Sequence, residues 1–185
     1  ISNVCVELTG GYSASGCSFD VVGEYEPQQT DFRASGAGKA LQLGARVSVE
    51  LGYITTECVF YGLIISVTYE FDAQSAPYIH VECMDVKCLL MKMQRLEIRS
   101  EKNLRQLASA LLDGAPVSSY LKGKTILLPT APEEPLPMAM ESDYDFLVRQ
   151  AQYRGCEFFI VAGKAYFRDG PGAAPPILTM SPAQG

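Results

Sequence analysis

The chain has 185 residues, of which 48% are hydrophobic, enough for one large domain or two small ones with a packed core. Its net charge of −6 and pI near 4.8, with no lysine and arginine cluster longer than a pair, argue against a nucleic-acid partner. No apolar run reaches the roughly 18 to 20 residues of a membrane-spanning helix, and the N-terminus lacks the charged start of a signal peptide. We therefore expect no membrane segment and no export signal.

The first half of the chain alternates between apolar and polar residues with period two, which is typical of half-buried strands. The expected inward faces are Val4, Val6 and Leu8; Phe19 and Val21; Val47, Val49, Leu51 and Tyr53; Val59, Tyr61, Leu63, Ile65, Val67, Tyr69 and Phe71; and Ile79, Val81 and Cys83. The fourth segment would span about 40 Å at 3.3 Å per residue, so we expect a bend near Gly62. A long, bent strand is typical of a barrel wall, and the pattern predicts an antiparallel β-barrel over residues 1–92.

From about Met84 the pattern changes to a helical one. Residues 86–93 predict a short helical turn. A longer amphipathic helix follows, which Ser100 is expected to cap and Gly114 to end. Its apolar residues fall at i, i+3, i+4, i+7 and i+8: Leu104, Leu107, Ala108, Leu111 and Leu112.

A proline-rich stretch, 129–137, leads to a second helix over about 143–154. Ser142 is its expected N-cap, Asp145 stands at the third position of a variant capping box, and Gly155 is placed to end it. The expected buried stripe is Tyr144, Leu147, Val148 and Ala151.

A β-hairpin is expected after this helix, with strands over 156–161 and 165–168 and a tight turn at Gly163-Lys164, where a type II′ turn prefers glycine first. The fold class is therefore α+β: a barrel followed by an α/β subdomain, 93–169, with two helices and a hairpin. Residues 170–185 have the composition of a linker. Because the chain begins at Ile1 and ends in Pro-Ala-Gln-Gly, we expect that it is a piece of a longer protein.

Two segments resemble catalytic motifs without meeting their requirements. Residues 35–40, Ser-Gly-Ala-Gly-Lys-Ala, lack the glycine spacing of a phosphate-binding loop and the hydroxyl residue after lysine, so they are interpreted as a flexible loop. Glu141, Asp143 and Asp145 could be acid/base carboxylates, but they lie at a helix start, where free N–H groups favour negative charge. We interpret them as structural.

Nucleophilic and metal chemistry have little support. The serines of 10–16 lack a Gly-x-Ser-x-Gly elbow, and His80, the single histidine, is expected on the surface. The six cysteines have no metal-binding spacing and are expected to be reduced, buried thiols. Together with the incomplete motifs above, this predicts no catalytic residue, no cofactor and no metal. Tyrosines along strands leave a carbohydrate- or cell-wall-binding β module as an alternative, with a hydrolase as a weaker one.

Residues 141–151, Glu-Ser-Asp-Tyr-Asp-Phe-Leu-Val-Arg-Gln-Ala, followed by Gly-Cys-Glu-Phe-Phe at 155–159, resemble a signature of the phage late control gene D family, which includes VgrG spike proteins and contractile-tail hubs. Residues 43–49 and 60–64 are similar to a strand pair of that family's first barrel. The resemblance spans about residues 1–168. Its motif residues, for which a structural role is implied, are Glu141, Ser142, Asp143, Tyr144, Phe146, Leu147, Arg149, Ala151 and Gly155.

The resemblance implies a structural baseplate hub protein that adapts a six-fold tail tube to a three-fold spike, and not an enzyme. The implied partners are further copies of itself, as a trimer in the intact hub, together with tail tube and spike proteins. The implied location is the bacterial cytoplasm, followed by assembly into a virion tail or injection particle. These hubs continue into a second barrel, which would begin where this chain stops.

Overall fold

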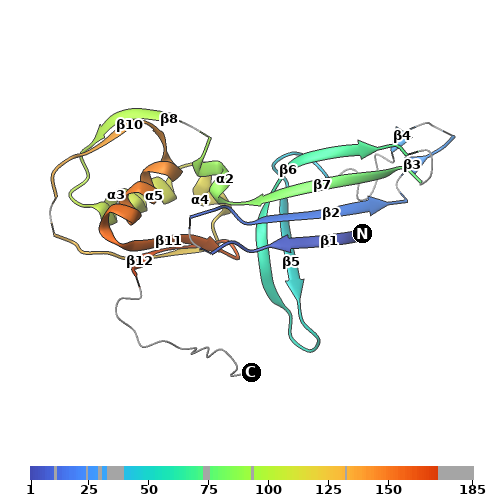
Figure 1. Ribbon diagram of the computed structural model, residues 1–185, viewed down its shortest axis with the longest axis horizontal. Coiled ribbons are helices and arrows are strands. Elements are labelled where there is room, and N and C mark those ends of the chain that lie inside the picture. Colours follow the sequence, from blue (N-terminus) through green and yellow to red (C-terminus); the bar gives the residue numbers. More distant parts are fainter. Residues whose placement is uncertain are drawn as a thin grey trace, which may run out of the picture.

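The computed structural model describes residues 1–10, 12–23, 25–28, 31–32, 40–72, 76–92, 94–131 and 133–170. Most of the glycine-rich segment 35–40 and the linker after Gly170 lie outside these residues. The molecule is elongated, with a β-sheet half and an α/β half side by side along its long axis (Figure 1). No helix in the described part of the chain is long and apolar enough to span a membrane.

The sheet half is a curled, five-stranded antiparallel sheet in the order β1-β2-β7-β6-β5. Its strands are β1 (Ser2–Glu7), β2 (Gly16–Val22), β5 (Arg46–Leu51), β6 (Glu57–Glu70) and β7 (Tyr78–Asp85). A short ribbon pairs β3 (Tyr25–Glu26) with β4 (Asp31–Phe32). Among the described residues β1 and β5 remain unpaired edges, so the sheet forms a half-barrel and the predicted closed barrel is not confirmed.

Strand β6 gives the sheet its curl, because its two ends pair with different neighbours. Residues 57–63 pair with β5, whereas residues 62–70 pair with β7, and Figure 1 shows the strand bending between them. A Cβ on Gly62 would lie 2.2 Å from the carbonyl oxygen of Met84, closer than any side chain allows. The predicted bend is thus present, and glycine is required there by the close approach of β7.

The predicted single apolar face of β6 is wrong. A β-bulge between Ile64 and Ser66 shifts the alternation, so that Ile65 points outward and is 43% exposed. Before the bulge the strand is covered on both sides: Phe60 and Ile64 lie in the sheet core, whereas Tyr61 packs against the core of the α/β half.

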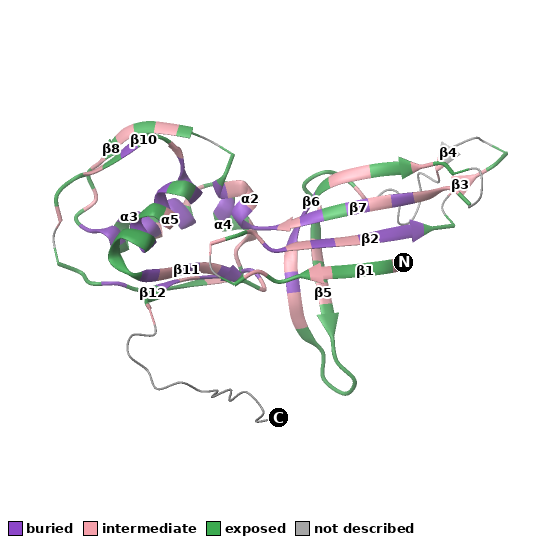
Figure 2. Ribbon diagram, viewed as in Figure 1, coloured by how far each residue is buried: buried purple, intermediate pink, exposed green. Residues whose placement is uncertain are grey.

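The central strands bury the residues that the sequence pattern assigns to them, and the edge strands do not. Phe19, Val21, Ile79, Val81 and Cys83 are buried, as predicted. The predicted inward positions Val4, Leu8, Leu51 and Tyr53 are exposed, because β1 and β5 are edges and because β5 ends at Leu51, before the turn that carries Tyr53. Figure 2 shows this difference as purple on β2 and β7 and green on β1 and the end of β5.

The α/β half is larger than the predicted two helices and hairpin. Its helices are α2 (Lys87–Leu90), α3 (Leu104–Asp113), α4 (Val117–Tyr120) and α5 (Asp143–Arg154). The hairpin β11 (Cys156–Val161) and β12 (Lys164–Asp169) gains a parallel strand, β9 (Gly123–Leu127), beside β12. A separate antiparallel ribbon joins β8 (Gln94–Arg99) to β10 (Leu136–Ser142). Neither α4 nor the strands β8, β9 and β10 were predicted from the sequence.

Helix α3 begins at Asn103 and not at the predicted Ser100. The side chain of Asn103 accepts a hydrogen bond from the backbone N–H of Gln106, with 3.0 Å between the two heavy atoms. Asparagine is as good an N-cap as serine and stands directly before the first helical residue. Ser100 directly follows the last residue of β8 and lies too early in the chain to cap this helix.

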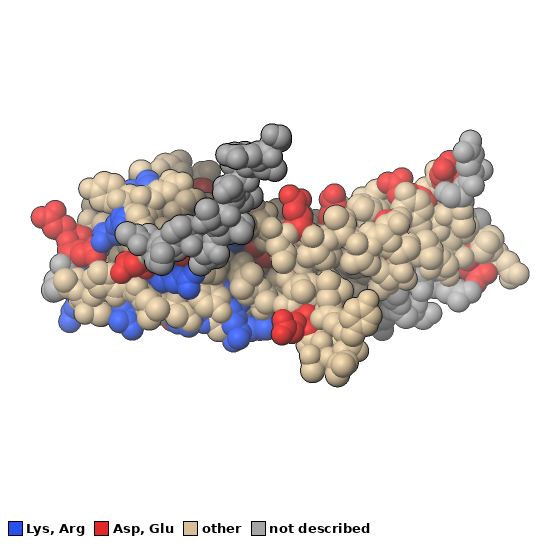
Figure 3. Space-filling view, turned by 60° about the horizontal axis from the view of Figure 1, so that its bottom comes forward, with Lys and Arg blue, Asp and Glu red and all other residues tan. Residues whose placement is uncertain are grey.

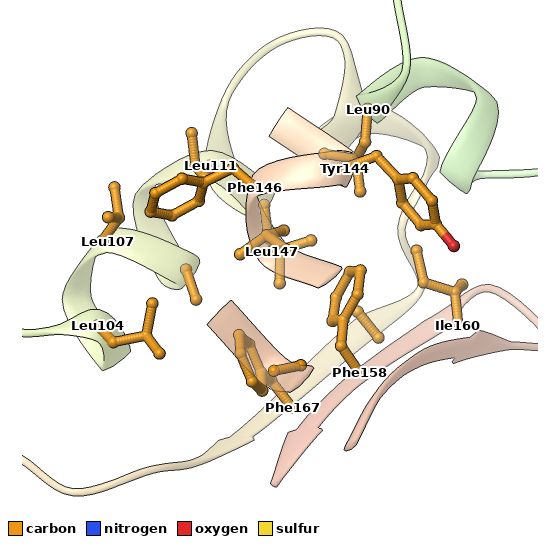
Figure 4. Close-up of a cluster of buried hydrophobic side chains, with 14 of the residues drawn as sticks. Leu90, Leu104, Leu107, Leu111, Tyr144, Phe146, Leu147, Phe158, Ile160 and Phe167 are labelled. Atoms are coloured by element: carbon orange, nitrogen blue, oxygen red, sulfur yellow. The ribbon is translucent and has the colours of Figure 1, made fainter. Parts of the chain in front are cut away.

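The α/β half has its own core, in which α3 and α5 pack on the hairpin. Leu147 lies at the centre of this cluster, between leucines of α3 and the rings of Phe158 and Phe167 (Figure 4). The predicted stripe of α5 needs one correction: Phe146 is fully buried, whereas Val148 is only partly buried. The ribbon β8–β10 and α3 cover more of α5 than a single stripe requires.

Side chains hold the two halves together at separate points. The hydroxyl of Tyr12, in the loop after β1, donates to the carbonyl of Cys156 at 3.0 Å. Arg46 of β5 donates to the carbonyl of Ser119 at 2.9 Å, and its guanidinium lies 4.7 Å from the centre of the Tyr120 ring. Contacts at both sides of the junction fix the sheet half against the α/β half.

Candidate functional site

The motif residues gather at the end of β10 and along α5. Ser142 is the N-cap, as predicted: its hydroxyl accepts from the backbone N–H of Asp145 at 3.0 Å and donates to the Asp145 carboxylate at 2.7 Å. Asp145 thereby closes the cap through a side-chain contact. The helix ends at Gly155, whose φ of 66° is left-handed and suits glycine.

Arginines from two different elements bind the other two carboxylates of the acidic group. Arg95 of β8 donates from Nε at 2.6 Å and from Nη2 at 3.0 Å to the two carboxylate oxygens of Asp143. Arg149 of α5 donates in the same two-pronged way to Glu141, at 3.0 and 2.6 Å. These hydrogen bonds lower the pKa of Glu141. Two carboxylates held by arginines are not a pair poised for acid/base exchange.

The remaining motif residues build the core. Tyr144, Phe146, Leu147 and Ala151 are all buried, and Figure 4 shows Tyr144 with its hydroxyl pointing away from the leucines. That hydroxyl has no hydrogen-bond partner within the described part of the chain, and burial, followed by the charge of Asp85, raises its pKa to about 12. Tyr144 is therefore neutral at physiological pH.

A buried charge cluster that the sequence analysis missed lies close to Tyr144, at the junction of the two halves. Lys87 is completely buried, and its ammonium group lies 3.6 Å from Asp85 and donates to the carbonyl of Ser13. Asp85 also accepts from the backbone N–H groups of Ser15 and Lys87, both at 2.9 Å. The cluster ties the loop between β1 and β2 to the start of the α/β half. Asp85 and Lys87 are visible in the sequence, but the pattern around them gives no sign that both charges are buried.

His80 is partly exposed and bound to Asp20, 2.7 Å away across β2 and β7. Asp20 also accepts from the amide of Asn3, and the bonds from His80 and Asn3 lower its pKa. The hydroxyl of Ser15, in the serine-containing loop, accepts a hydrogen bond from the backbone N–H of Thr9. The histidine and the serine loop thus have separate structural partners, and the contacts give neither a nucleophile–base pair.

All six cysteines are free, but they are not equally buried. Cys17, Cys83 and Cys156 are buried, Cys58 and Cys88 are intermediate, and Cys5 is exposed, so the expectation of buried thiols holds for the first three and is wrong for Cys5. Burial raises the pKa of Cys83 to about 12 and that of Cys88 to about 11. Among the described residues, no group of three or more His, Cys, Asp or Glu side chains could hold a metal ion.

A groove of about 540 Å³ lies between the two halves. The loop after β1 forms one wall, with Leu8 and Tyr12, and the outer edge of β11 forms the other, with Phe159 and Val161. The walls are mainly apolar, and Glu157 and Arg168, bonded to each other at 3.1 Å, are the charged residues that line it. The groove resembles a packing surface more than a reaction site.

Three solved structures similar to this fold are two tail proteins and a secretion-system component. A 43 kDa tail protein of prophage MuSo2 from Shewanella oneidensis matches with a TM-score of 0.62 and 16% identity over 86% of this chain and 48% of its own. The Escherichia coli c3393 protein, described as a component of the type VI secretion system similar to the T4 tail proteins gp27 and gp5, matches with 0.62 and 13% identity over 94% and 48%. A tail protein from Neisseria meningitidis MC58 matches with 0.60 and 13% identity over 89% and 45%.

The chain spans about half the length of these solved structures, and at such low identity the likeness concerns the fold. No curated protein matches it in sequence. The chain belongs to the family described as the Alg8 N-terminal domain, whose model matches residues 19–181. That description names no tail component, so the specific resemblance to the late control gene D family is not confirmed.

Proposed function

We propose that this chain is a structural part of a contractile tail or a related injection machine, and that it serves in the baseplate hub between tube and spike. The observation that carries the proposal is the agreement of two independent signals. The fold matches tail and type VI secretion proteins over 86 to 94% of this chain. The segment 141–159 separately resembles the signature of a hub and spike family.

The environment of that segment supports a structural role rather than a catalytic one. The motif carboxylates are bound by Arg95 and Arg149, its serine caps a helix, and its aromatic residues fill a core. These motif side chains therefore all make contacts that stabilise the α/β half. Beside this half, the open edges β1 and β5 of the curled sheet are templates for pairing with neighbouring subunits.

The partners in this proposal are further copies of the protein, a tail tube protein and a spike protein. Three subunits with two barrels each would imitate a six-fold tube on one side and present three-fold symmetry on the other. The half-barrel of residues 1–92 would be the first of the two, 93–169 the α/β subdomain beside it, and 170–185 the connection toward the second. Assembly would follow synthesis in the bacterial cytoplasm.

Electron microscopy tests the proposal. Negative-stain images of a longer protein that carries this chain should show three-fold rings, and rings should co-purify with tube and spike components. Particles without three-fold symmetry, or a purified protein that degrades peptidoglycan or binds cell-wall sugars as its main activity, would contradict it and favour the alternatives of a hydrolase or a carbohydrate-binding module.

A further inference from the structure

The outer face of the ribbon β8–β10 is apolar and exposed. Leu96 and Ile98 of β8 are each 74% exposed, and their cross-strand partners on β10 are Ala139 and Pro137, which are exposed as well. Residues opposite each other in an antiparallel pair share a face. These residues therefore form one apolar strip on the surface, a feature that in soluble proteins commonly marks an interaction site.

The charged residues of β8 point the other way, toward the helices. Arg95 binds Asp143 of α5, and Arg99 binds Glu97 at 2.9 Å and also binds Glu101. This arrangement inverts the usual one, in which apolar residues face inward. The Arg95–Asp143 pair and the buried side chain of Met138 on β10 hold the inner face of the ribbon toward the helices, which leaves Leu96 and Ile98 on the outer face.

The two edges of the ribbon differ in a way that directs pairing. On β10, the backbone N–H of Ala139 donates to Glu141 at 3.2 Å, and the carbonyl of Pro137 accepts from Arg149 at 3.0 Å. Side chains thus close the outer edge of β10. The backbone polar groups of residues 137 and 139 point away from β8. In an antiparallel pair, the backbone N–H and C=O groups of the directly opposite residues, Ile98 and Leu96, then point away from β10. In the described part of the chain no other strand lies beside β8.

We propose that the open edge of β8 pairs with the β8 edge of a second copy of this chain, antiparallel and around a two-fold axis, to give a four-stranded sheet β10-β8-β8-β10. An unpaired edge is a template for strand addition, and a two-fold contact uses one surface twice. The charges of β8 make it self-complementary. When Leu96 faces its own counterpart, Arg95 of each copy faces Glu97 of the other, and opposite charges across strands stabilise a sheet.

A register shifted by two residues on one strand would be unfavourable, because it would bring Glu97 opposite Glu97 and Arg95 opposite Arg99. Charge therefore selects the register centred on Leu96. A two-fold contact cannot be the contact that repeats around a three-fold ring, so this interface does not depend on the hub function, and either idea can fail without the other.

Sedimentation equilibrium on the 185-residue chain tests the interface. A contact of two short strands is far below the ~1,600 Å² of standard interfaces, so we expect a dissociation constant on the order of 100 µM. Wild-type protein should change from monomer to dimer between about 10 µM and about 1 mM. Leu96→Lys and Leu96→Pro should each raise the dissociation constant at least about tenfold, the proline by removing the N–H groups at the centre of the contact.

The matched control is Ile54→Lys, which replaces an equally apolar and fully exposed residue in the β5–β6 turn and should leave dimerisation unchanged. Glu97→Gln tests the register: it should weaken the dimer if Glu97 faces Arg95, and strengthen it if Glu97 faces Glu97. Circular dichroism checks that each variant is folded. A chain that stays monomeric to about 1 mM, a dimer that persists in both folded Leu96 variants, or one that Ile54→Lys weakens equally would each overturn the proposal.

Discussion

The hydroxyl of Ser142 makes two hydrogen bonds at the start of α5, and its loss should be measurable. Ser142→Ala removes the cap on the N–H of Asp145, and we expect it to lower the free energy of unfolding by about 1 kcal/mol. Asp145→Asn should cost less, because the cap remains.

Asp143→Asn should cost about 1.5 kcal/mol, since it breaks the two-pronged contact with Arg95. Urea denaturation measures all three. A peptidoglycan-degrading activity that Asp143→Asn abolished without loss of stability would contradict the structural role.

Glu141 makes the stability of the α/β half sensitive to acid. Its pKa is lowered from an ordinary value of 4.5, first by the hydrogen bonds from Arg149. A carboxyl with a lowered pKa stabilises the fold above its unfolded pKa, and this stabilisation is lost as the pH falls through the folded value. We expect stability to fall below about pH 4.5, and Arg149→Met to remove part of that fall. If the variant and the wild type lose stability in parallel from pH 6 to about pH 3, the pair contributes nothing.

The cysteines should react in an order that their surroundings set. Cys5 is exposed and should react first with a thiol reagent at pH 8, with Cys58 next. Cys83 and Cys88, with pKa values of about 12 and about 11, have almost no thiolate at that pH and should react only after unfolding. Titration of native protein should therefore find fewer than the six thiols that denatured protein shows. A native disulfide between Cys83 and Cys88 in mass spectrometry would contradict this prediction.

At the scale of elements, the bend of β6 depends on one glycine. Gly62→Ala would place a methyl group 2.2 Å from the Met84 carbonyl, so β6 and β7 would have to separate, and we expect a loss of about 2 kcal/mol or more. Gly123→Ala in β9 is the matched control, because a Cβ there meets nothing within 4 Å. The control should be neutral or slightly stabilising. Equal melting temperatures for the two variants would show that the bend tolerates a side chain.

The elements that the sequence predicted well are those whose signals are local. Helix α5 has a cap, a stripe and a terminal glycine within one short segment, and β2 and β7 are covered on one face and alternate cleanly. Strand β6 was assigned one continuous face, which holds for Val67 but not for the part before the bulge, because that bulge depends on β7, which lies later in the chain. Strand β8 was missed because it turns Leu96 and Ile98 outward. The motif, which includes Arg149, was visible, but the pairing of Asp143 with Arg95 was not, since these two residues lie 48 positions apart.

At the scale of the whole molecule, the sheet half and the α/β half differ both in surface charge and in the number of open strand edges. Figure 3 shows lysine and arginine gathered over the α/β half, whereas the sheet half shows acidic groups among neutral ones. The sheet half also carries the open edges β1 and β5 and the exposed turn between β5 and β6. The α/β half has the larger buried core, whereas the sheet half carries the open edges and the exposed apolar turn that a partner could cover.

The last prediction concerns assembly and follows from the proposed hub. A ring of two barrels per subunit closes only if each open edge meets a neighbour of the other kind. This chain spans 48% of the tail protein that it resembles in fold, and its described residues form one curled sheet. Three copies of it would leave gaps that no edge can bridge. Light scattering at about 10 µM, roughly tenfold below the dissociation constant expected for the β8 contact, should report mainly monomer with a minor dimer. A longer protein that contains a second barrel should be trimeric under the same conditions. A stable trimer of the 185-residue chain alone would show instead that the half-barrel and the α/β half already contain the three-fold interface.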